Sequence, residues 1–189
     1  MGQQNMQSDR IKWNRKFISM AYPEDPSDIV SKFVRIASPG VALDIAAGNG
    51  RNSLFLAQSG FKVEALDISD VGLRSFVGRH PMVQAVCIDL DRYDLARNRY
   101  SLILNIRYLN RHLLSQIGPA LVSGGVLIFE TYLRRPEFNP QRHFNCDHLL
   151  EVNELLQEFI GLEVVYYRET FTARSDEPYP LASLVAFNR

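Results

Sequence analysis

The chain has 189 residues, of which 46% are hydrophobic and 22% are charged, so it is long enough for one substantial core and short for two domains. Its 21 basic residues are balanced by 21 acidic ones, which argues against nucleic acid as a partner, because binding to phosphate backbones usually requires an excess of positive charge. No stretch is apolar for long enough to span a membrane, and the first ten residues lack the apolar core of a signal peptide.

The two cysteines, Cys87 and Cys146, form no Cys-x-x-Cys pair, which is typical of a protein from a reducing compartment. Together with the lack of a targeting signal, this predicts a cytoplasmic protein with no membrane partner. The composition gives no indication of the oligomeric state.

Two helices are predicted before the first strand. Residues 1–10 are polar and we expect them to be mobile, which leaves a single domain over residues 11–189. Hydrophobic residues then recur at the spacing of one helix face, at Trp13, Phe17 and Met20. For the second helix, Asp25 is the predicted cap and Pro26 lies in the first turn.

From residue 41 onward, strand-like and helix-like runs alternate. The strands are expected near 41–46, 62–67, 83–88, 101–105 and 125–130. The helices are expected near 51–58, 70–78, 109–122 and 146–159. This alternation is typical of an α/β protein with a doubly wound, mainly parallel sheet. The last two strand-like runs, LEVVYYRETF and LASLVAFN, are joined by TARSDEPYP, which has no room for a crossover helix, so they should form an antiparallel hairpin that completes seven strands.

Acidic residues recur in the first three strands: Asp44 lies in the first, Asp67 ends the second and Asp89 ends the third. In a doubly wound sheet, ligands bind beyond the carboxyl ends of the strands, where the strand order reverses. There Asp67 can accept hydrogen bonds from both hydroxyls of a ribose, and Asp89 can reach an adenine amino group. The alternative is structural, because aspartate at a strand end often caps the next helix.

The turn GNGRNS favours a ligand other than a dinucleotide. The dinucleotide fingerprint Gly-x-Gly-x-x-Gly or Ala is met at Gly48 and Gly50 but fails at Ser53. All four lysines lie at or before Lys62, so a Tyr-x-x-x-Lys catalytic pair is absent. A dehydrogenase is therefore the weaker hypothesis.

Several of these motifs resemble those of a known family. ALDIAAGNG resembles the first motif of class I S-adenosylmethionine-dependent methyltransferases, ALDIS their ribose-binding motif and CIDL their adenine-side motif. The closing hairpin is similar to their reversed last strand. WNRKF, GNGRNSLFLAQSGF and YSLILNIRYLNRHLL further resemble the tellurite-resistance-type, TehB-like branch.

The resemblance implies a Rossmann-like methyltransferase fold with S-adenosyl-L-methionine as cofactor. It places Asp67 at the ribose, and Asp89 with Leu90 at the adenine. Ala46 stands where the family's loop often has its first glycine. The implied cofactor-binding residues are Trp13, Asp44, Ala46, Gly48, Gly50, Arg51, Asn52, Asp67, Ile68, Asp89, Leu90 and Asn105.

The loops after the fourth and fifth strands, NIRYLNR and ETYLRRPEF, are expected to hold a small-molecule methyl acceptor. Guanidinium groups suit an oxyanion or a carboxylate, and with the tellurite-type likeness they favour an anionic or soft acceptor, such as a chalcogen or a thiol. A general base is optional for such an acceptor, so no catalytic residue is assigned. The acceptor-side candidates are Asn105, Arg107, Tyr108, Glu130, Tyr132 and Arg134, with Arg135 beside them.

Several alternatives stay open at this point. One alternative is that the arginines of these loops are ordinary surface residues. Another is that the protein is a non-catalytic S-adenosylmethionine-binding or scaffold subunit. Trp13 and Phe17 form either an aromatic lid over the sulfonium or the packing face of the first helix. For the cluster His143, Cys146 and His148, a capped amphipathic helix explains the sequence better than a zinc site, so no metal is expected.

Overall fold

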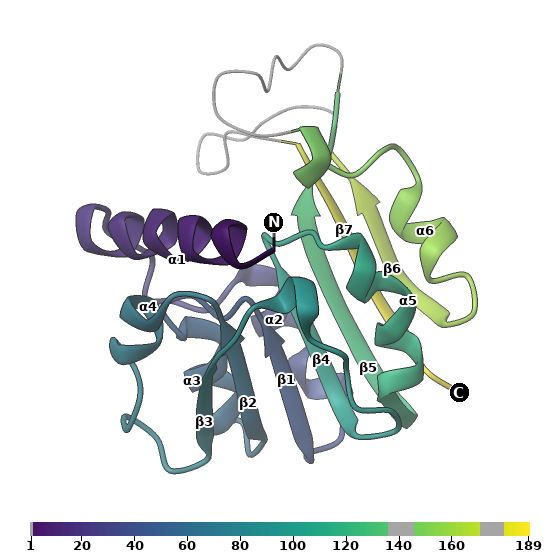
Figure 1. Ribbon diagram of the computed structural model, residues 1–189. Helices are drawn as coiled ribbons and strands as arrows, with labels where there is room; N and C mark the ends of the chain where they lie inside the picture. The colour runs from purple at the N-terminus through teal and green to yellow at the C-terminus, as the bar shows by residue number, and fades with distance from the viewer. Residues whose placement is uncertain (1, 136–145, 171–179) are drawn as a thin grey trace.

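The computed structural model describes residues 2–135, 146–170 and 180–189, with the side chains of 2–6 and of residue 146 excepted (Figure 1). These residues form a seven-stranded sheet in the order β3-β2-β1-β4-β5-β7-β6. The strands are β1 Val41–Ile45, β2 Lys62–Asp67, β3 Val83–Cys87, β4 Tyr100–Ile106, β5 Leu121–Tyr132, β6 Glu163–Glu169 and β7 Leu181–Phe187. All pairs are parallel except those that β7 makes with β5 and with β6. The predicted sheet and terminal hairpin are confirmed; the hairpin's connection, residues 171–179, lies outside the described part.

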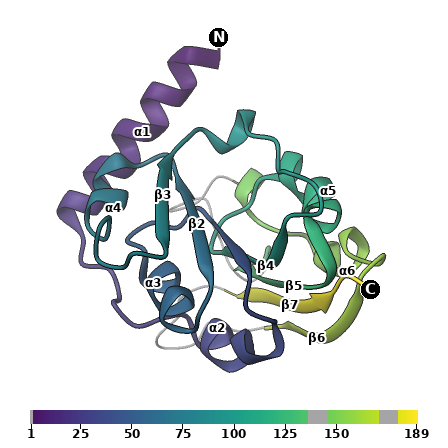
Figure 2. The ribbon, with the colours of Figure 1, turned by 90° about the horizontal axis from the view of Figure 1, so that it is seen from below.

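Helices cover both faces of the sheet, as Figure 2 shows from below. The α-helices are α1 Gly2–Ser19, α2 Asp28–Phe33, α3 Arg51–Gln58, α4 Asp70–Arg74, α5 Arg111–Ala120 and α6 Glu154–Glu158. Short 3-10 turns are η1 Val34–Ile36, η2 Leu90–Arg92 and η4 Cys146–His148. The buried side chains of α2, α3 and α4 pack on one face, and those of α5 and α6 pack on the other.

The core follows from the alternation of side chains along the strands. In β5, Ile128 packs in the cluster under α2 and α3, whereas Leu127 and Phe129 pack in the cluster under α5 and α6. Because both faces of a central strand are buried, β4 and β5 contain nearly continuous apolar runs. The strand order reverses between β1 and β4, so the carboxyl ends of these two strands border the crevice where such folds bind ligands.

The structure corrects two predicted boundaries. Helix α1 begins at Gly2 rather than after residue 10; the mobility of that segment stays a prediction. Helix α2 is preceded by Ser27, not by Asp25, because the Ser27 amide donates to Asn52 Oδ1 of α3 at 2.9 Å and holds the chain extended at that point.

The predicted helix over 146–159 is wrong. The chain instead forms η4, a short parallel bridge between Leu133 and Leu150, and α6. The Leu150 amide donates to Tyr132 O at 2.9 Å, and Asn153 takes a left-handed backbone conformation with φ of 63°. A tertiary pairing with the end of β5 therefore interrupts a stretch whose local pattern is helical.

We expect Gly50→Ala to destabilise the protein by about 3 kcal/mol or more, because Gly50 has φ of +74° and an added Cβ would lie 2.2 Å from the buried Phe76 ring. Gly60→Ala is the matched control: φ is +96° there, but no atom lies within 4 Å of the added Cβ, so only the backbone cost of about 1 kcal/mol is expected. Urea unfolding of both variants measures the difference. Equal losses would show that the ring contact has no effect.

Candidate functional site

Asp44 occupies the buried carboxyl end of β1. Its side chain is 1% exposed, and Ser53 Oγ at the start of α3 donates to Asp44 Oδ2 at 2.6 Å. Burial raises the pKa of Asp44 to about 7; the bond from Ser53 opposes this rise, and the nearby Asp67 adds to it. The carboxyl therefore exchanges its proton near neutral pH unless a positive group comes close.

The turn after β1 is tightly bent. Ala46 has φ of +56° and Gly48 has φ of +60°. A left-handed conformation is strained for alanine and free for glycine, which explains why the family's loop often has glycine at the first of these positions. The Gly48 amide points at β2, where it donates to Asp67 Oδ2 at 2.8 Å.

Asp67 joins three segments at the end of β2. Besides the Gly48 amide, the Ser69 amide at the start of α4 donates to its Oδ1 at 2.7 Å. Burial raises the pKa of Asp67, and the backbone amides of Ser69 and Gly48 oppose that rise. Each carboxylate oxygen keeps a further lone pair, so Asp67 can still accept from the hydroxyls of a ribose.

Asp89 and Leu90 follow β3. Asp89 precedes η2 and accepts from the Asp91 amide at 3.1 Å, which is the capping role that the structural alternative gave it. Leu90 is buried, and its carbonyl accepts from Asn110 Nδ2 at 3.2 Å. Because Asn110 also caps α5, the adenine-side segment is tied to the start of that helix.

Helix α1 lies beside the glycine turn that follows β1, and it is attached there through contacts with α4 (Figure 1). Ser69 Oγ donates to Asn14 Oδ1 at 2.7 Å, and Arg10 forms a 3.0 Å ion pair with Asp70. Phe17 packs against the glycine turn, since a Cβ on Gly48 would lie 3.3 Å from its ring. Trp13 instead lies beside Lys16, whose amine is 4.4 Å from the ring centre. Of the two aromatic residues, Phe17 is therefore the one placed against the turn.

Three other predicted cofactor residues have structural partners. Arg51 donates to Asp25 O and to Ser27 Oγ, at 3.1 and 3.0 Å, while Asn52 accepts from the Ser27 amide. Both side chains therefore hold the segment before α2 against α3. The Ile68 carbonyl accepts from the Cys87 thiol at 3.5 Å.

On the acceptor side, Asn105 and Tyr108 lie together after β4. Asn105 is 3% exposed, pairs in register with Ile45 of β1 and donates from Nδ2 to Tyr108 O at 2.6 Å. Burial raises the pKa of the Tyr108 phenol, which accepts from Asn110 Nδ2 at 3.3 Å. The Tyr108 phenol thus stays protonated at neutral pH.

Each arginine that the sequence offered for an anionic acceptor is paired with a glutamate. Arg107 pairs with Glu130 at 2.7 Å, and its guanidinium carbon lies 5.6 Å from the ring centre of Tyr132. The other two pairs are Arg134 with Glu151 and Arg135 with Glu169, each at 2.9 Å. The guanidinium charges are therefore compensated within the protein.

The residues at this edge fit S-adenosylmethionine better than a dinucleotide. Asp44, Asp67 and Asp89 bring carboxylates to the carboxyl ends of three neighbouring strands. Carboxylates accept from ribose hydroxyls and attract a sulfonium, whereas they repel a pyrophosphate. The two buried carboxyls with raised pKa values add to this preference, because a cationic ligand offsets the cost of their burial by Coulomb attraction.

Sequence reasoning missed the polar residues that support this edge: Ser53, Ser69, Asn14 and Ser183. Serine two residues after a strand-terminal aspartate, as in LDIS, is a cap signal that would have identified Ser69. The partner of Ser53 is Asp44, nine residues earlier, whereas the partners of Asn14 and Ser183 come from distant parts of the chain, so no local pattern reveals those two.

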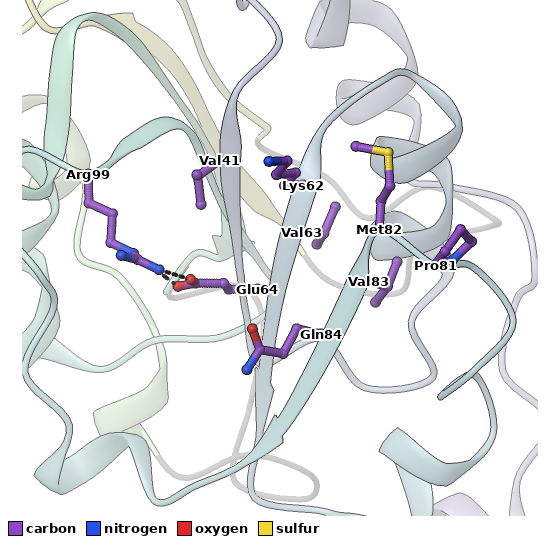
Figure 3. A pocket seen from close by; sticks show the side chains of 9 residues that line it. All are labelled: Val41, Lys62, Val63, Glu64, Pro81, Met82, Val83, Gln84 and Arg99. Carbon is purple, nitrogen blue, oxygen red and sulfur yellow. Dashed lines mark hydrogen bonds and ion pairs between the residues drawn. The ribbon is translucent and has the colours of Figure 1, made fainter.

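Two hollows lie outside the carboxyl-end site. The first, of about 340 Å³, is at the amino ends of β1, β2 and β3, and none of the predicted site residues lines it (Figure 3). The other, of about 550 Å³, borders the outer side of the glycine turn, where Phe17, Arg51 and Gly72 line it. We place the candidate site at the carboxyl ends of the strands, because its polar groups converge there.

Within the described ranges, no three His, Cys, Asp or Glu side chains gather closely enough to hold a metal ion. His143 lies outside these ranges, and Cys146 and His148 belong to η4. No helix in the described part of the chain has both the length and the apolar character needed to cross a membrane.

The family model of the tellurite resistance protein TehB matches residues 14–121, which include the glycine turn, all three strand-end aspartates and Asn105. The chain belongs to the TehB family. A search of curated protein sequences found no significant match.

Solved structures similar to this TehB-family chain are S-adenosylmethionine-dependent methyltransferases and related proteins. TehB from Haemophilus influenzae superposes with a TM-score of 0.72 at 18% identity, over 95% of this chain and 67% of that one. Geranyl diphosphate C-methyltransferase from Streptomyces coelicolor, in complex with S-adenosyl-L-homocysteine, gives 0.67 at 13% identity, over 97% and 98%. A methyltransferase from Mesorhizobium loti gives 0.66 at 15% identity, over 84% and 95%. The chain therefore has the methyltransferase fold.

We expect the stability of the ligand-free protein to fall as the pH rises from about 4 to 7, in part through Asp44. In this window the unfolded chain has lost the Asp44 proton while the native state keeps it, so each pH unit lowers the free energy of unfolding by up to about 1.4 kcal/mol. Asp44→Asn keeps the acceptor for Ser53 and removes the titration. Urea unfolding at pH 4, 5.5 and 7 should show a flatter profile for the variant; parallel profiles would contradict the assignment.

Proposed function

We propose that this methyltransferase transfers the methyl group of S-adenosylmethionine to a small, soft nucleophile held at the carboxyl ends of β4 and β5. The observation that carries the proposal is the position of Asp67, whose buried carboxylate is held by the Gly48 and Ser69 amides at the carboxyl end of β2, the neighbour of β1, where the strand order reverses toward β4. That carboxylate would hold the ribose, with Asp44 below the methionine part and Asp89 with Leu90 beside the adenine.

When bound, S-adenosylmethionine supplies a methyl group that its sulfonium already activates, so the protein's task is to orient the acceptor and exclude water. Phe17, packed on the glycine turn, would exclude water from one side. Asn105, between the ends of β1 and β5, would border the space next to the sulfur. Orientation of this kind lowers a barrier by roughly 7–11 kcal/mol.

The acceptor-side groups favour an acceptor that is nucleophilic by itself. Glu130 accepts from Arg107 and from Ser183 Oγ, at 2.7 and 2.5 Å, so both of its oxygens are engaged. Tyr108 has a raised pKa and stays protonated. These groups can orient an acceptor but are poorly suited to remove its proton. A thiolate or a chalcogen oxyanion needs no such removal, and the tellurite resistance named for the family agrees with this choice.

The balanced charge of the chain favours a small molecule over nucleic acid as the acceptor. In the Streptomyces coelicolor neighbour the bound molecules are likewise small, geranyl diphosphate among them. Because Arg107, Arg134 and Arg135 are all paired with glutamates, softness of the acceptor is a stronger criterion than negative charge.

We expect Asp67→Ala to weaken S-adenosylmethionine binding by about 10- to 100-fold, because two hydrogen bonds to a charged acceptor are lost. Asp94→Ala, which changes an 84% exposed side chain, is the control and should leave affinity unchanged. Isothermal titration with S-adenosylmethionine, S-adenosylhomocysteine and NAD measures the effect. Wild-type binding of NAD alone, or full affinity in a folded Asp67→Ala variant, would contradict the site.

We expect labelled methyl groups to pass from S-adenosylmethionine to small thiols, selenols or tellurite faster than to phenols, amines or carboxylic acids. Rates with thiols should rise with pH in proportion to the fraction of the thiol that is ionised, since the enzyme supplies no base. Product analysis after single turnover distinguishes the acceptors. Strong cofactor binding without transfer to any acceptor class would instead favour the non-catalytic scaffold alternative.

A further inference from the structure

Glu130 and Arg107 are joined by two separate contacts. The Arg107 amide donates to the Glu130 carbonyl at 2.7 Å, and Arg107 Nη1 donates to Glu130 Oε1 at 2.7 Å. Ser183 of β7 donates to the other carboxylate oxygen at 2.5 Å. The end of β5 therefore holds both the backbone and the side chain of the residue that follows β4.

Arg107 is held in an unfavourable backbone conformation. Its φ is +60°, which L-residues other than glycine rarely adopt and which costs roughly 1–2 kcal/mol. Such strain persists only where the surroundings enforce it, and the contacts with Glu130 are suited to do so. The guanidinium is also kept over the Tyr132 ring, at 5.6 Å from its centre.

The left-handed turn at Arg107 sets the positions of the residues on either side of it. It folds the chain back so that Tyr108 O accepts from Asn105 Nδ2 at 2.6 Å. The same segment continues to Asn110, which bonds to Leu90 O and to Asp91 Oδ1. Residues 105–110 thus connect the acceptor side to the adenine side, with Arg107 at the bend.

Glu130 influences Asn105 only through the main chain. Glu130 pairs in register with Ile106, which packs in the cluster under α2 and α3. Because side chains alternate along a strand, Asn105 projects toward the opposite face, that of α5. The Glu130 carboxylate and the Asn105 amide therefore lie on different faces of the sheet.

We propose that Glu130 is a positioning residue for methyl transfer: by holding Arg107 in its left-handed turn, it sets where Asn105 and Tyr108 lie beside the cofactor. This inference rests on the proposed function for its kinetic consequence. Its structural consequence, the geometry of residues 105–108, is independent of the reaction.

The chain offers a matched control near the amino ends of the strands, at the opposite end of the sheet from the site. Glu64 of β2 is ion-paired with Arg99 (Figure 3) and accepts from Tyr100 Oη. In the same way, Glu130 is paired with Arg107 and accepts from Ser183. The two glutamate side chains are similarly exposed, 17% for Glu64 and 14% for Glu130. Glu64→Gln therefore removes a comparable ion pair at the amino ends of the strands, away from the site.

The first experiment compares Glu130→Gln with Glu64→Gln in the full chain. We expect Glu130→Gln to lower kcat about 10- to 100-fold, since small displacements of orienting groups have effects of this size, while the Kd for S-adenosylmethionine changes less than about twofold. In the NMR spectrum, the side-chain amide of Asn105 should shift in Glu130→Gln and not in Glu64→Gln. Unchanged kcat and an unshifted Asn105 amide in Glu130→Gln would overturn the proposal, as would equal effects of both variants.

A second pair of variants separates conformation from charge and replaces the first if Glu130→Gln does not fold. Arg107→Gly and Arg107→Ala both remove the guanidinium, but only glycine adopts φ of +60° freely. We expect Arg107→Gly to keep at least about five times the kcat of Arg107→Ala, and to keep the wild-type position of the Asn105 amide signal. Equal kcat values and equal Asn105 shifts in the two variants would overturn the proposal.

The proposed function and the Glu130 inference have distinguishable outcomes. Failure of the proposed function would appear as cofactor binding without methyl transfer in the wild-type protein. Failure of the Glu130 inference would appear as an Asn105 amide signal that does not respond to Glu130→Gln and does not distinguish Arg107→Gly from Arg107→Ala, whatever the wild-type activity is.

Discussion

The hydrogen bonds of the Asp67 carboxylate are the constraint on which the site depends. One oxygen receives the Gly48 amide from the turn after β1, and the other receives the Ser69 amide at the start of α4. Ser69 in turn bonds to Asn14 of α1. A single side chain therefore sets the relative positions of two strand ends and two helices, and a ligand that contacts Asp67 acts on all four.

The site is built at a cost to the stability of the ligand-free protein. Burial raises the pKa values of both Asp44 and Asp67, which means that their ionised forms are poorly solvated. A cationic cofactor bound beside them would offset this cost by Coulomb attraction, so binding and stability are expected to be linked. Preorganised, unfavourably placed charges of this kind are common at functional sites.

Backbone strain is also located at the carboxyl ends of the strands. Ala46 follows β1 and Arg107 follows β4, the two neighbouring strands at which the order reverses, and both have left-handed backbones without being glycine. Their surroundings differ: Ala46 leads into the turn held by Asp67, and Arg107 is held by Glu130. Asn105 lies between these two bends, which is the physical reason for regarding it as bordering the reacting groups.

The local pattern of the sequence determined the alternation of strands and helices, the antiparallel terminal hairpin and the presence of Asp44, Asp67 and Asp89 at one edge, because side-chain periodicity and turn residues act over short distances. The tertiary structure alone decided three other features. It broke the predicted helix over 146–159 through the bridge between Leu133 and Leu150, attached α1 to α4, and paired each candidate arginine with a glutamate. Those partners are distant in sequence, so their meeting depends on sheet order and register, which short-range patterns do not contain.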